Sequence, residues 1–265
     1  MRTWISCLAF SLAVGCAHTN LHIDDGGSGN ALPVLFVHGN GANSTQWRAQ
    51  LDYLRPTRRA IAFDLRGMGQ SPAPANGDYS VKAMADDVAA VADALRLKRF
   101  IIVGHSYGGA VVAQYVATHP DRVAGVVYAD SAGNLEVTDE QAAKFLAALR
   151  KNKEKFVRAW FAPILKGSSA EVQKAVFESE DKTPAETIAS ALNGLRSIDM
   201  RALLDAYHGP LLAIAAADIE GPSSLHVQFP DIPVRKISGT GHWLMMDKPG
   251  EFNRILDEFL AGIRQ

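Results

Sequence analysis

The sequence predicts an α/β fold: a doubly wound, mostly parallel sheet of about seven strands, with a helical cap inserted after strand 6. Short apolar runs rich in β-branched residues alternate with segments whose apolar residues recur every three or four positions. Such alternation is typical of a parallel sheet covered by helices on both faces. Over residues 134–205, by contrast, helix signals follow one another with no strand between them. We therefore expect one α/β domain over residues 31–265 that contains the cap.

The strands and helices of the sheet region can be placed in chain order. Residues 20–23 are expected to form an edge strand within an N-terminal tether at 17–30. The other strands are expected at 33–37, 59–63, 99–103, 123–129, 211–217 and 233–237. The helices between and after them are expected at 80–96, 106–119 and 249–263. Right-handed crossovers would bring the loops that follow the parallel strands to one edge of the sheet.

The expected cap contains four short helices. Thr138 with Gln141 and Ser168 with Glu171 have the spacing of capping boxes, which mark helix N-termini. The cap is also rich in aromatic residues, and of these Trp160 and Phe161 are our candidates for substrate binding. The alternative is that aromatic side chains pack the cap against itself and the core.

Composition narrows the class of protein. The chain has 265 residues, 48% of them hydrophobic and 21% charged, with a formal net charge of −1. No basic stripe is present to attract nucleic acid. Both cysteines, Cys7 and Cys16, lie close to the N-terminus, and neither His-Glu-x-x-His nor Cys-x-x-Cys occurs. We therefore expect no nucleic-acid partner, no metal and no cofactor.

The motif Gly104-His105-Ser106-Tyr107-Gly108 is the strongest functional signal in the chain. It has the pattern Gly-x-Ser-x-Gly, follows an apolar β-branched run and precedes a helical pattern. In a tight turn between strand and helix, the glycines allow close approach and the serine hydroxyl is exposed above the sheet. The pattern also occurs in glycine-rich loops without function, but its context makes Ser106 the candidate nucleophile.

A serine hydroxyl needs a base, because it is a weak nucleophile at its free pKa. His242 lies in Gly239-Thr240-Gly241-His242-Trp243, between an expected strand and the last expected helix. The other seven histidines lie beside other motifs, in the N-terminal segment or away from any glycine-framed loop. His242 is therefore the candidate base.

Two aspartates compete to orient this histidine. Asp218 stands at the end of the strand expected at 211–217, and Asp130 follows the strand expected at 123–129. Carboxyl ends of parallel strands are where ligand-facing residues gather, so both positions are suitable. The chain order Ser106, Asp218, His242 favours Asp218, and Asp130 remains the alternative.

An oxyanion hole requires two N–H donors aimed at the developing negative charge. The backbone N–H of the residue after the nucleophile, Tyr107, is one candidate. The strand at 33–37 runs into His38-Gly39-Asn40-Gly41, which makes the backbone N–H of Asn40 the second. Side-chain changes at these two positions should therefore matter less than changes to the backbone.

Together these motifs resemble those of α/β hydrolases with a serine nucleophile, of the esterase and lipase type. Asp64-Leu65-Arg66-Gly67-Met68-Gly69-Gln70-Ser71 resembles the family's turn after the fourth strand, although Met68 departs from the usual aromatic or histidine. Gly241-His242 followed by Asp247 and Pro249 resembles the segment around the family's catalytic histidine.

The resemblance implies a serine hydrolase that cleaves a carboxylic ester-like bond of a small or medium apolar substrate through an acyl-enzyme. Peptidase, thioesterase, lactonase, perhydrolase and carbon–carbon hydrolase activities stay open, because one triad supports many substrates. A noncatalytic envelope binding protein is the alternative of another class.

The first sixteen residues predict export. Met1-Arg2-Thr3 is a short basic start, an apolar run covers residues 4–14, and Cys16 follows small residues. This pattern is typical of a signal peptide ending in a lipobox. We expect a bacterial envelope protein held at the membrane by a lipid on Cys16, with a periplasmic or secreted protein as the alternative.

Overall fold

The computed structural model describes residues 19–264 and contains a seven-stranded sheet within them. The strand order is β1-β3-β2-β4-β5-β6-β7, with β1 antiparallel to β3 and all other pairs parallel. The strands are β1 (Ile23–Gly26), β2 (Val34–Val37), β3 (Ala60–Phe63), β4 (Phe100–His105), β5 (Val123–Ala129), β6 (Leu211–Ala216) and β7 (Val234–Ile237). The predicted fold class is confirmed. The signal and lipobox segment predicted at 1–16, including Cys16, lies outside the described residues.

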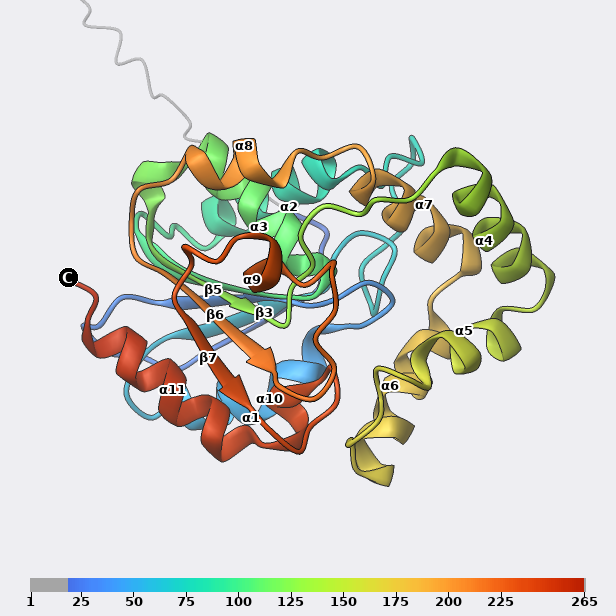
Figure 1. Cartoon of the computed structure of the whole chain (residues 1–265). Coiled ribbons are helices and arrows are strands. Elements are labelled where there is room, and N and C mark those ends of the chain that lie inside the picture. The colour runs from blue at the N-terminus through green and yellow to red at the C-terminus, as the bar shows by residue number, and fades with distance from the viewer. Residues whose placement is uncertain (1–18, 265) are drawn as a thin grey trace, which may run out of the picture.

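Helices cover both faces of the sheet (Figure 1). On one face lie α2 (Val81–Ala94), α3 (Tyr107–Thr118), α8 (Met200–Asp205) and α9 (Leu225–Gln228). On the other lie α1 (Arg48–Leu54), α10 (Leu244–Asp247) and α11 (Pro249–Ala261). Two short 3₁₀ helices, Ser44–Trp47 and Pro120–Arg122, precede α1 and β5. Apart from the edge strand, the expected strands and the three long helices of the sheet region are confirmed within a few residues.

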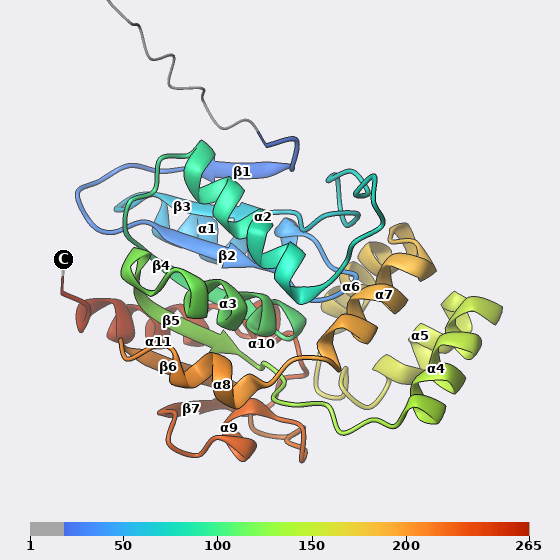
Figure 2. The same cartoon turned by 90° about the horizontal axis from the view of Figure 1, so that it is seen from above.

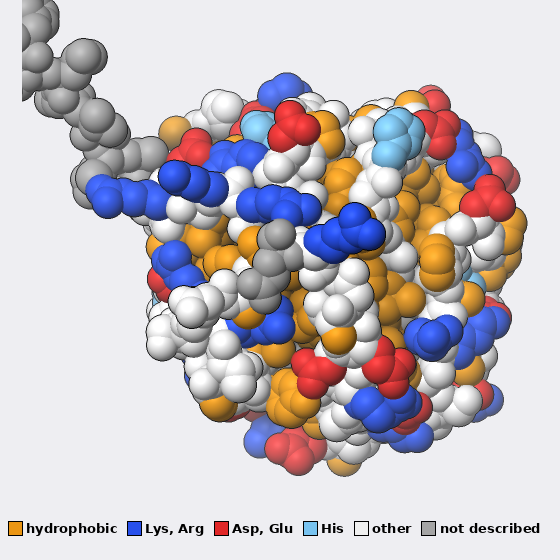
Figure 3. Space-filling view, turned by 90° about the vertical axis from the view of Figure 1, so that its left-hand side faces the viewer, with side chains coloured by type: hydrophobic (Ala, Val, Ile, Leu, Met, Phe, Trp, Pro, Cys, Tyr) orange, Lys and Arg blue, Asp and Glu red, His pale blue; other side chains and the backbone are white. Residues whose placement is uncertain are grey.

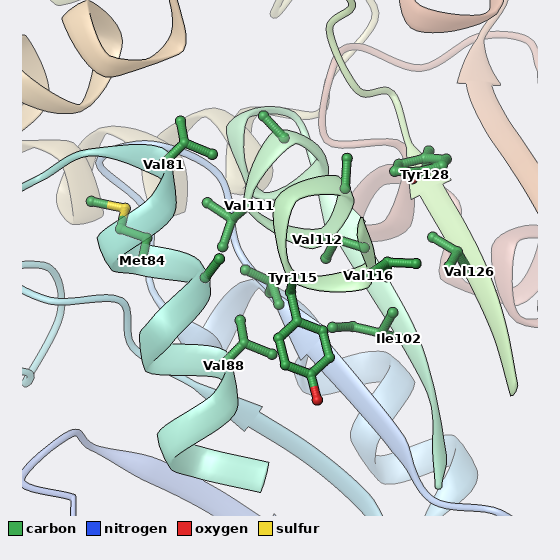
Figure 4. Close-up of a cluster of buried hydrophobic side chains, with 14 of the residues drawn as sticks. Val81, Met84, Val88, Ile102, Val111, Val112, Tyr115, Val116, Val126 and Tyr128 are labelled. Atoms are coloured by element: carbon green, nitrogen blue, oxygen red, sulfur yellow. The ribbon is translucent and has the colours of Figure 1, made fainter. Parts of the chain in front are cut away.

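Alternate residues of the inner strands supply the two halves of the core. In β5, Val126 and Tyr128 face α2 and α3, while Val127 and Ala129 belong to the cluster on the opposite face. Figure 4 shows part of the first half, where the Tyr115 ring of α3 lies between Val88 of α2 and Ile102 of β4, with further valines of both helices around it. A strand that is buried on both faces reads as an unbroken apolar run, which is why the sequence located these strands well.

The edge strand is the one strand that sequence placed poorly. It was expected at 20–23 and lies at Ile23–Gly26, because pairing with β3 continues into the two aspartates Asp24 and Asp25. Arg55 and Arg59 each form an ion pair with one of them. Aspartates are rare in strands and suggested a turn, but at a sheet edge their carboxylates can reach arginines from elsewhere in the chain.

A helical insertion, which we define as α4–α7, lies between β5 and β6 and to one side of the sheet (Figures 1 and 2). Its helices are α4 (Asp139–Lys151), α5 (Lys153–Phe161), α6 (Ala170–Lys182) and α7 (Ala185–Leu195). The insertion follows the fifth described strand and not the sixth, because β1 alone precedes β2 among the described residues. A fifth helix, α8, also lies between β5 and β6, but it packs on α3 in the core.

Of the two capping boxes predicted in the insertion, one is present and the other is shifted by one residue. The Thr138–Gln141 capping box is present at α4 with both of its hydrogen bonds. The box predicted at Ser168 and Glu171 is wrong by one residue, because Ser169 accepts from the N–H of Val172 at the start of α6. Ser168 instead donates to Asp247, 2.7 Å away.

On the side of the molecule away from the insertion, Lys and Arg side chains are interspersed with Asp and Glu, and hydrophobic side chains show between them (Figure 3). Neither sign of charge covers this face. Over residues 19–264, no helix combines the length and hydrophobicity needed to cross a membrane.

Candidate active site

Ser106 sits on a strained turn between β4 and α3. Its φ is 52° and its ψ −119°, a backbone conformation that costs free energy for a residue with a Cβ. The turn is close-packed: a Cβ on Gly104 would lie 2.6 Å from the carbonyl oxygen of Gly108, and one on Gly108 2.5 Å from that of His38. The glycines are therefore needed for this turn to form, as the motif predicts.

His242 lies in the loop between β7 and α10, and three hydrogen bonds fix it. Its Nδ1 is 2.6 Å from Oδ2 of Asp130. Its backbone N–H donates to the carbonyl oxygen of Ile164 at 2.7 Å, and its own carbonyl oxygen accepts from Nε2 of His105 at 3.0 Å. Because the Asp130 carboxylate accepts a hydrogen bond from Nδ1–H, the proton of the neutral imidazole stays on Nδ1, and Nε2 is left as the proton acceptor.

Asp130 is held as firmly as its partner. It directly follows β5 with a φ of 41°, and its N–H donates to the carbonyl oxygen of Ile214 at 2.8 Å. Its Oδ1 accepts from the N–H of Ala216 at 3.0 Å, so each carboxylate oxygen has its own donor. The side chains of Asp130 and His242 are 12% and 15% exposed. Their pairing is therefore largely shielded from competing water.

The prediction that Asp218 orients His242 is wrong in this structure. Asp218 is exposed, and its Oδ2 accepts from the N–H of Gly239 at 2.5 Å. It therefore closes the turn after β7 instead of contacting the imidazole. The physical reason is placement: β6 ends at Ala216, so Asp218 is already in the following turn, whereas Asp130 comes directly after β5.

Strand order also favours Asp130. β5 is the direct neighbour of β4, the strand that leads to Ser106, and β6 lies one strand further away. The N–H of Ser106 donates to the carbonyl oxygen of Ala129, the residue before Asp130. A single sequence does not reveal which strands are neighbours, so chain order alone pointed to the wrong aspartate.

Ser106 and His242 line one cavity of about 140 Å³. Asn40 and Tyr107, the candidates for the oxyanion hole, belong to its wall, and so do Trp160 and Phe161 from the insertion. The cavity therefore brings together all the predicted site residues among those described except Asp218. The rest of the insertion's share of the wall is aliphatic: Ile164, Leu192 and Leu195.

The Asn40 side chain bonds to the insertion, and the Tyr107 side chain is buried in the core. Asn40 Nδ2 donates to the carbonyl oxygen of Ile188 in α7 at 3.1 Å. The Tyr107 side chain is 2% exposed, and burial raises the pKa of its phenol. Both side chains pack against their surroundings, which is consistent with catalytic roles for the backbone N–H groups alone.

Sequence reasoning missed His105 and His38, which support the site from behind. His105 is buried, and burial lowers the pKa of its imidazole well below the usual value. It therefore remains neutral while it donates to the His242 carbonyl, and its ring lies 4.6 Å from that of His242. His38 donates from Nδ1 to the Gly39 carbonyl at 2.7 Å and accepts from the N–H of Leu65. The sequence feature that could have identified them is their position inside the two glycine-containing motifs, at 38–41 and 104–108.

The Asp64–Ser71 turn braces the loop that carries Asn40. The carboxylate of Asp64 accepts from the N–H groups of Ser44 and Gln70, at 2.7 and 2.8 Å. Met68, the departure noted in this motif, is 1% exposed and packs into the core, so it does not reach the cavity. Within residues 19–264, no group of three or more His, Cys, Asp or Glu side chains is arranged to hold a metal ion.

Comparison with known proteins agrees with this geometry. The sequence profile of the alpha/beta hydrolase fold family matches residues 33–249, from β2 to the start of α11. The chain belongs to this family. Within the α/β hydrolase match lie the turn with Ser106, both strand ends that carry aspartates, and the loop with His242. It also spans the helical insertion.

Relatives of this α/β hydrolase differ in their named activities. A 2-hydroxymuconate semialdehyde hydrolase of Pseudomonas sp. is 28% identical over 92% of this chain and 90% of its own length. A 2-hydroxy-6-oxo-2,4-heptadienoate hydrolase of Pseudomonas putida is 29% identical over 93% and 94%. Among solved structures, a thermophilic esterase from Thermogutta terrifontis is 27% identical, with a TM-score of 0.82 over 92% of this chain and 94% of that one. This α/β hydrolase is thus similar to hydrolases of several kinds.

Proposed function

We propose that this protein is a serine hydrolase that cleaves a carboxylic ester-like bond of a small or medium apolar substrate through an acyl-enzyme. The observation that carries the proposal is the short, largely buried contact between His242 and Asp130 beside a serine on a strained turn. A binding protein has no need of a histidine held in one tautomer in the same cavity as a serine on a strained turn. The coarser statement, that the chain is a hydrolase of the α/β family, rests on its relatives.

The proposed reaction follows from the order of the groups. His242 takes the proton of the Ser106 hydroxyl at Nε2 while the serine oxygen attacks the carbonyl carbon. Asp130 stabilises the imidazolium that forms, and the backbone N–H groups of Asn40 and Tyr107 bind the oxyanion. The imidazolium then gives its proton to the departing alcohol. In the second half, His242 deprotonates a water molecule, which attacks the acyl-enzyme. The bond to the serine oxygen then breaks, the acid leaves, and the imidazolium returns its proton to Ser106.

The cavity wall favours an ester of an apolar acid or alcohol. Beyond the reacting groups, its surface comes from aromatic and aliphatic side chains such as Trp160, Phe161 and Leu195. An esterase is among the similar structures. Carbon–carbon bond cleavage is the second candidate, because two relatives that match nearly the whole chain carry names of that kind. Peptidase, thioesterase, lactonase and perhydrolase activities use the same groups and belong in the same substrate panel.

Active-site labelling tests the proposal. We expect a small fluorophosphonate to form an adduct that peptide mapping places on Ser106. The Ser106→Ala variant should lose the adduct and the hydrolysis of p-nitrophenyl acetate. Ser197→Ala is a matched control, because Ser197 is exposed and bonds to Gly194 in the insertion. Folded protein without an adduct would support the noncatalytic binding protein instead.

We also propose export to the bacterial envelope with a lipid on Cys16. The support is the basic start, the apolar run and the position of the cysteine in the sequence. Labelling of cells with radioactive palmitate should mark the protein and not its Cys16→Ser variant. An unlabelled protein in the periplasmic fraction would leave export standing and remove the lipid anchor.

A further inference from the structure

A second cavity adjoins the catalytic one. It has a volume of about 400 Å³ and lies among α4, α7 and the segment before α4. Leu135, Trp160 and Leu192 belong to the walls of both cavities, so the two spaces meet at these side chains. The mechanism above makes no use of this space.

Size indicates that the two cavities serve one ligand. Pockets for small organic molecules usually measure roughly 300–1,000 Å³. The catalytic cavity, at about 140 Å³, is well below that range, whereas the two together fall within it. The serine and histidine have room for the reacting group, and the larger space begins on the far side of Trp160.

The chemistry of the second cavity suits an aliphatic chain. Its inner wall is formed by Ala142, Phe145 and Leu146 of α4 opposite Leu192 of α7. Phe145 lies 5.1 Å from Trp160 in an edge-to-face arrangement, which places the shared wall within an aromatic cluster. These side chains are only partly buried apart from Ala142, and an apolar ligand would gain by covering them.

The polar groups of the second cavity gather around Arg196. This guanidinium donates to Asp139 at 2.6 Å and to the carbonyl oxygen of Val137 at 3.2 Å. It thereby joins the end of α7 to the start of α4. Its Nε is buried and has no hydrogen-bond partner in the described part of the chain.

We propose that the second cavity is the subsite for an extended aliphatic chain on the substrate. The chain runs from the carbonyl at Ser106 past Leu135, Trp160 and Leu192 into the space between α4 and α7. This inference rests on the proposed ester hydrolysis and adds the class of substrate: medium-chain esters in preference to acetates.

Variants that fill the second cavity test the proposal. Ala142→Phe and Leu146→Trp each place a larger side chain in its wall, and neither residue lines the catalytic cavity. Ala147→Phe is the matched control, because Ala147 is exposed on the same helix. The measurement is the ratio of kcat/KM for octanoyl to that for acetyl esters of p-nitrophenol, with octyl acetate as a probe of the alcohol side.

We expect the wild type and Ala147→Phe to prefer the longer chain on one side of the ester. Each filling variant should lower that preference at least about tenfold, since even one methylene in a hydrophobic pocket is worth about that much. An unaltered preference in a folded Leu146→Trp variant would overturn the proposal. A uniform loss on short and long esters would overturn it too, because it would show general damage to the site.

A binding measurement separates this inference from the proposed function. Calorimetry of sodium octanoate with the Ser106→Ala variant, alone and combined with Leu146→Trp, does not depend on turnover. Binding that the filling substitution weakens would support the subsite even if no ester is cleaved. Normal labelling of Ser106 together with no octanoate binding and no chain-length preference would leave the hydrolase standing and exclude the subsite.

Discussion

The two sides of the catalytic cavity are built from different kinds of residue: polar groups on the sheet side and apolar side chains on the insertion side. The sheet side supplies the proposed reacting groups, of which Ser106 and Asp130 stand directly after strands and are fixed by backbone hydrogen bonds, as in the clamp that Ile214 and Ala216 form on Asp130. The insertion side supplies apolar side chains, of which Trp160 is one. A few polar contacts join the two sides, including His242 to Ile164 and Asn40 to Ile188. We infer that the sheet side sets the chemistry and the insertion side sets which substrates reach it.

The largest expected effect is on the sheet side. In Asp130→Asn, the amide can present an N–H to Nδ1 of His242, which would place the imidazole proton on Nε2 and remove the base. We expect kcat to fall about 10⁴-fold, with little change in thermal stability. Steady-state kinetics with p-nitrophenyl acetate measures this loss.

Asp218→Asn is the matched control for that variant, because Asp218 stands at the end of the neighbouring strand and contacts only the turn at Gly239 in the described structure. We expect kcat to change less than about threefold, since the cost is one exposed hydrogen bond. If Asp218→Asn were the more damaging of the two, the orienting role would return to Asp218.

On the insertion side, the strongest effect should come from Glu180 in α6. Its side chain is 2% exposed, its Oε2 is buried without a partner among the described residues, and burial raises its pKa to about 8. The folded protein therefore keeps a proton that the unfolded chain releases near pH 4.5. Because the unfolded state binds fewer protons between these values, the stability of the wild type should fall as pH rises from about 5 to 8.

Glu180→Gln removes that titration. We expect its free energy of unfolding to exceed that of the wild type by up to about 4 kcal/mol at pH 8, and the gap to shrink towards pH 5. Denaturant titrations at several pH values measure it. Glu178→Gln is the control, since Glu178 is exposed on the same helix. A gap that stays constant with pH would mean that the Glu180 carboxyl ionises normally in the folded protein.

The junction of the two sides can be tested at Gly41, in the loop after Asn40. Its φ is 71°, and an added Cβ would collide with the carboxyl oxygens of Glu180. We expect Gly41→Ala to destabilise the protein by about 2–3 kcal/mol and to lower kcat by displacing the Asn40 N–H. Thermal denaturation and kinetics measure the two effects.

Gly77→Ala separates backbone strain from collision. Gly77 has a similar φ of 65°, but nothing would lie within 4 Å of its Cβ. We expect a loss of only about 1 kcal/mol and no change in kcat. Equal losses of stability in the two variants would show that the Glu180 side chain moves aside at little cost. The insertion would then be packed less tightly on this loop than the contacts indicate.

The same contrast governs how much the sequence could predict. The strands and the serine turn of the sheet side could be predicted because their signals are local: apolar runs for β2 and β4, and glycines around Ser106. The pairing of His242 with Asp130 was not, because it depends on which strands are neighbours. The edge strand was misplaced for a similar reason, since Asp24 and Asp25 are stabilised by arginines about thirty residues away. In the insertion, capping residues located helix starts to within a residue, but the cavity between α4 and α7 arises only from their packing.

The smallest expected effect comes from the Asn40 side chain, which extends from the sheet side and bonds to the insertion. Its Nδ2 bonds to Ile188 in α7, whereas its proposed role in catalysis uses the backbone N–H. Asn40→Ala should therefore cost about 1 kcal/mol of stability and raise KM a few-fold by loosening the insertion over the cavity. If the variant instead lost turnover by a factor of about 10² or more, the side chain itself would be a donor to the oxyanion, since that is the usual loss for one such donor. The division of labour between the two sides would then fail at this residue, because a contact that holds the insertion would also be part of the chemistry.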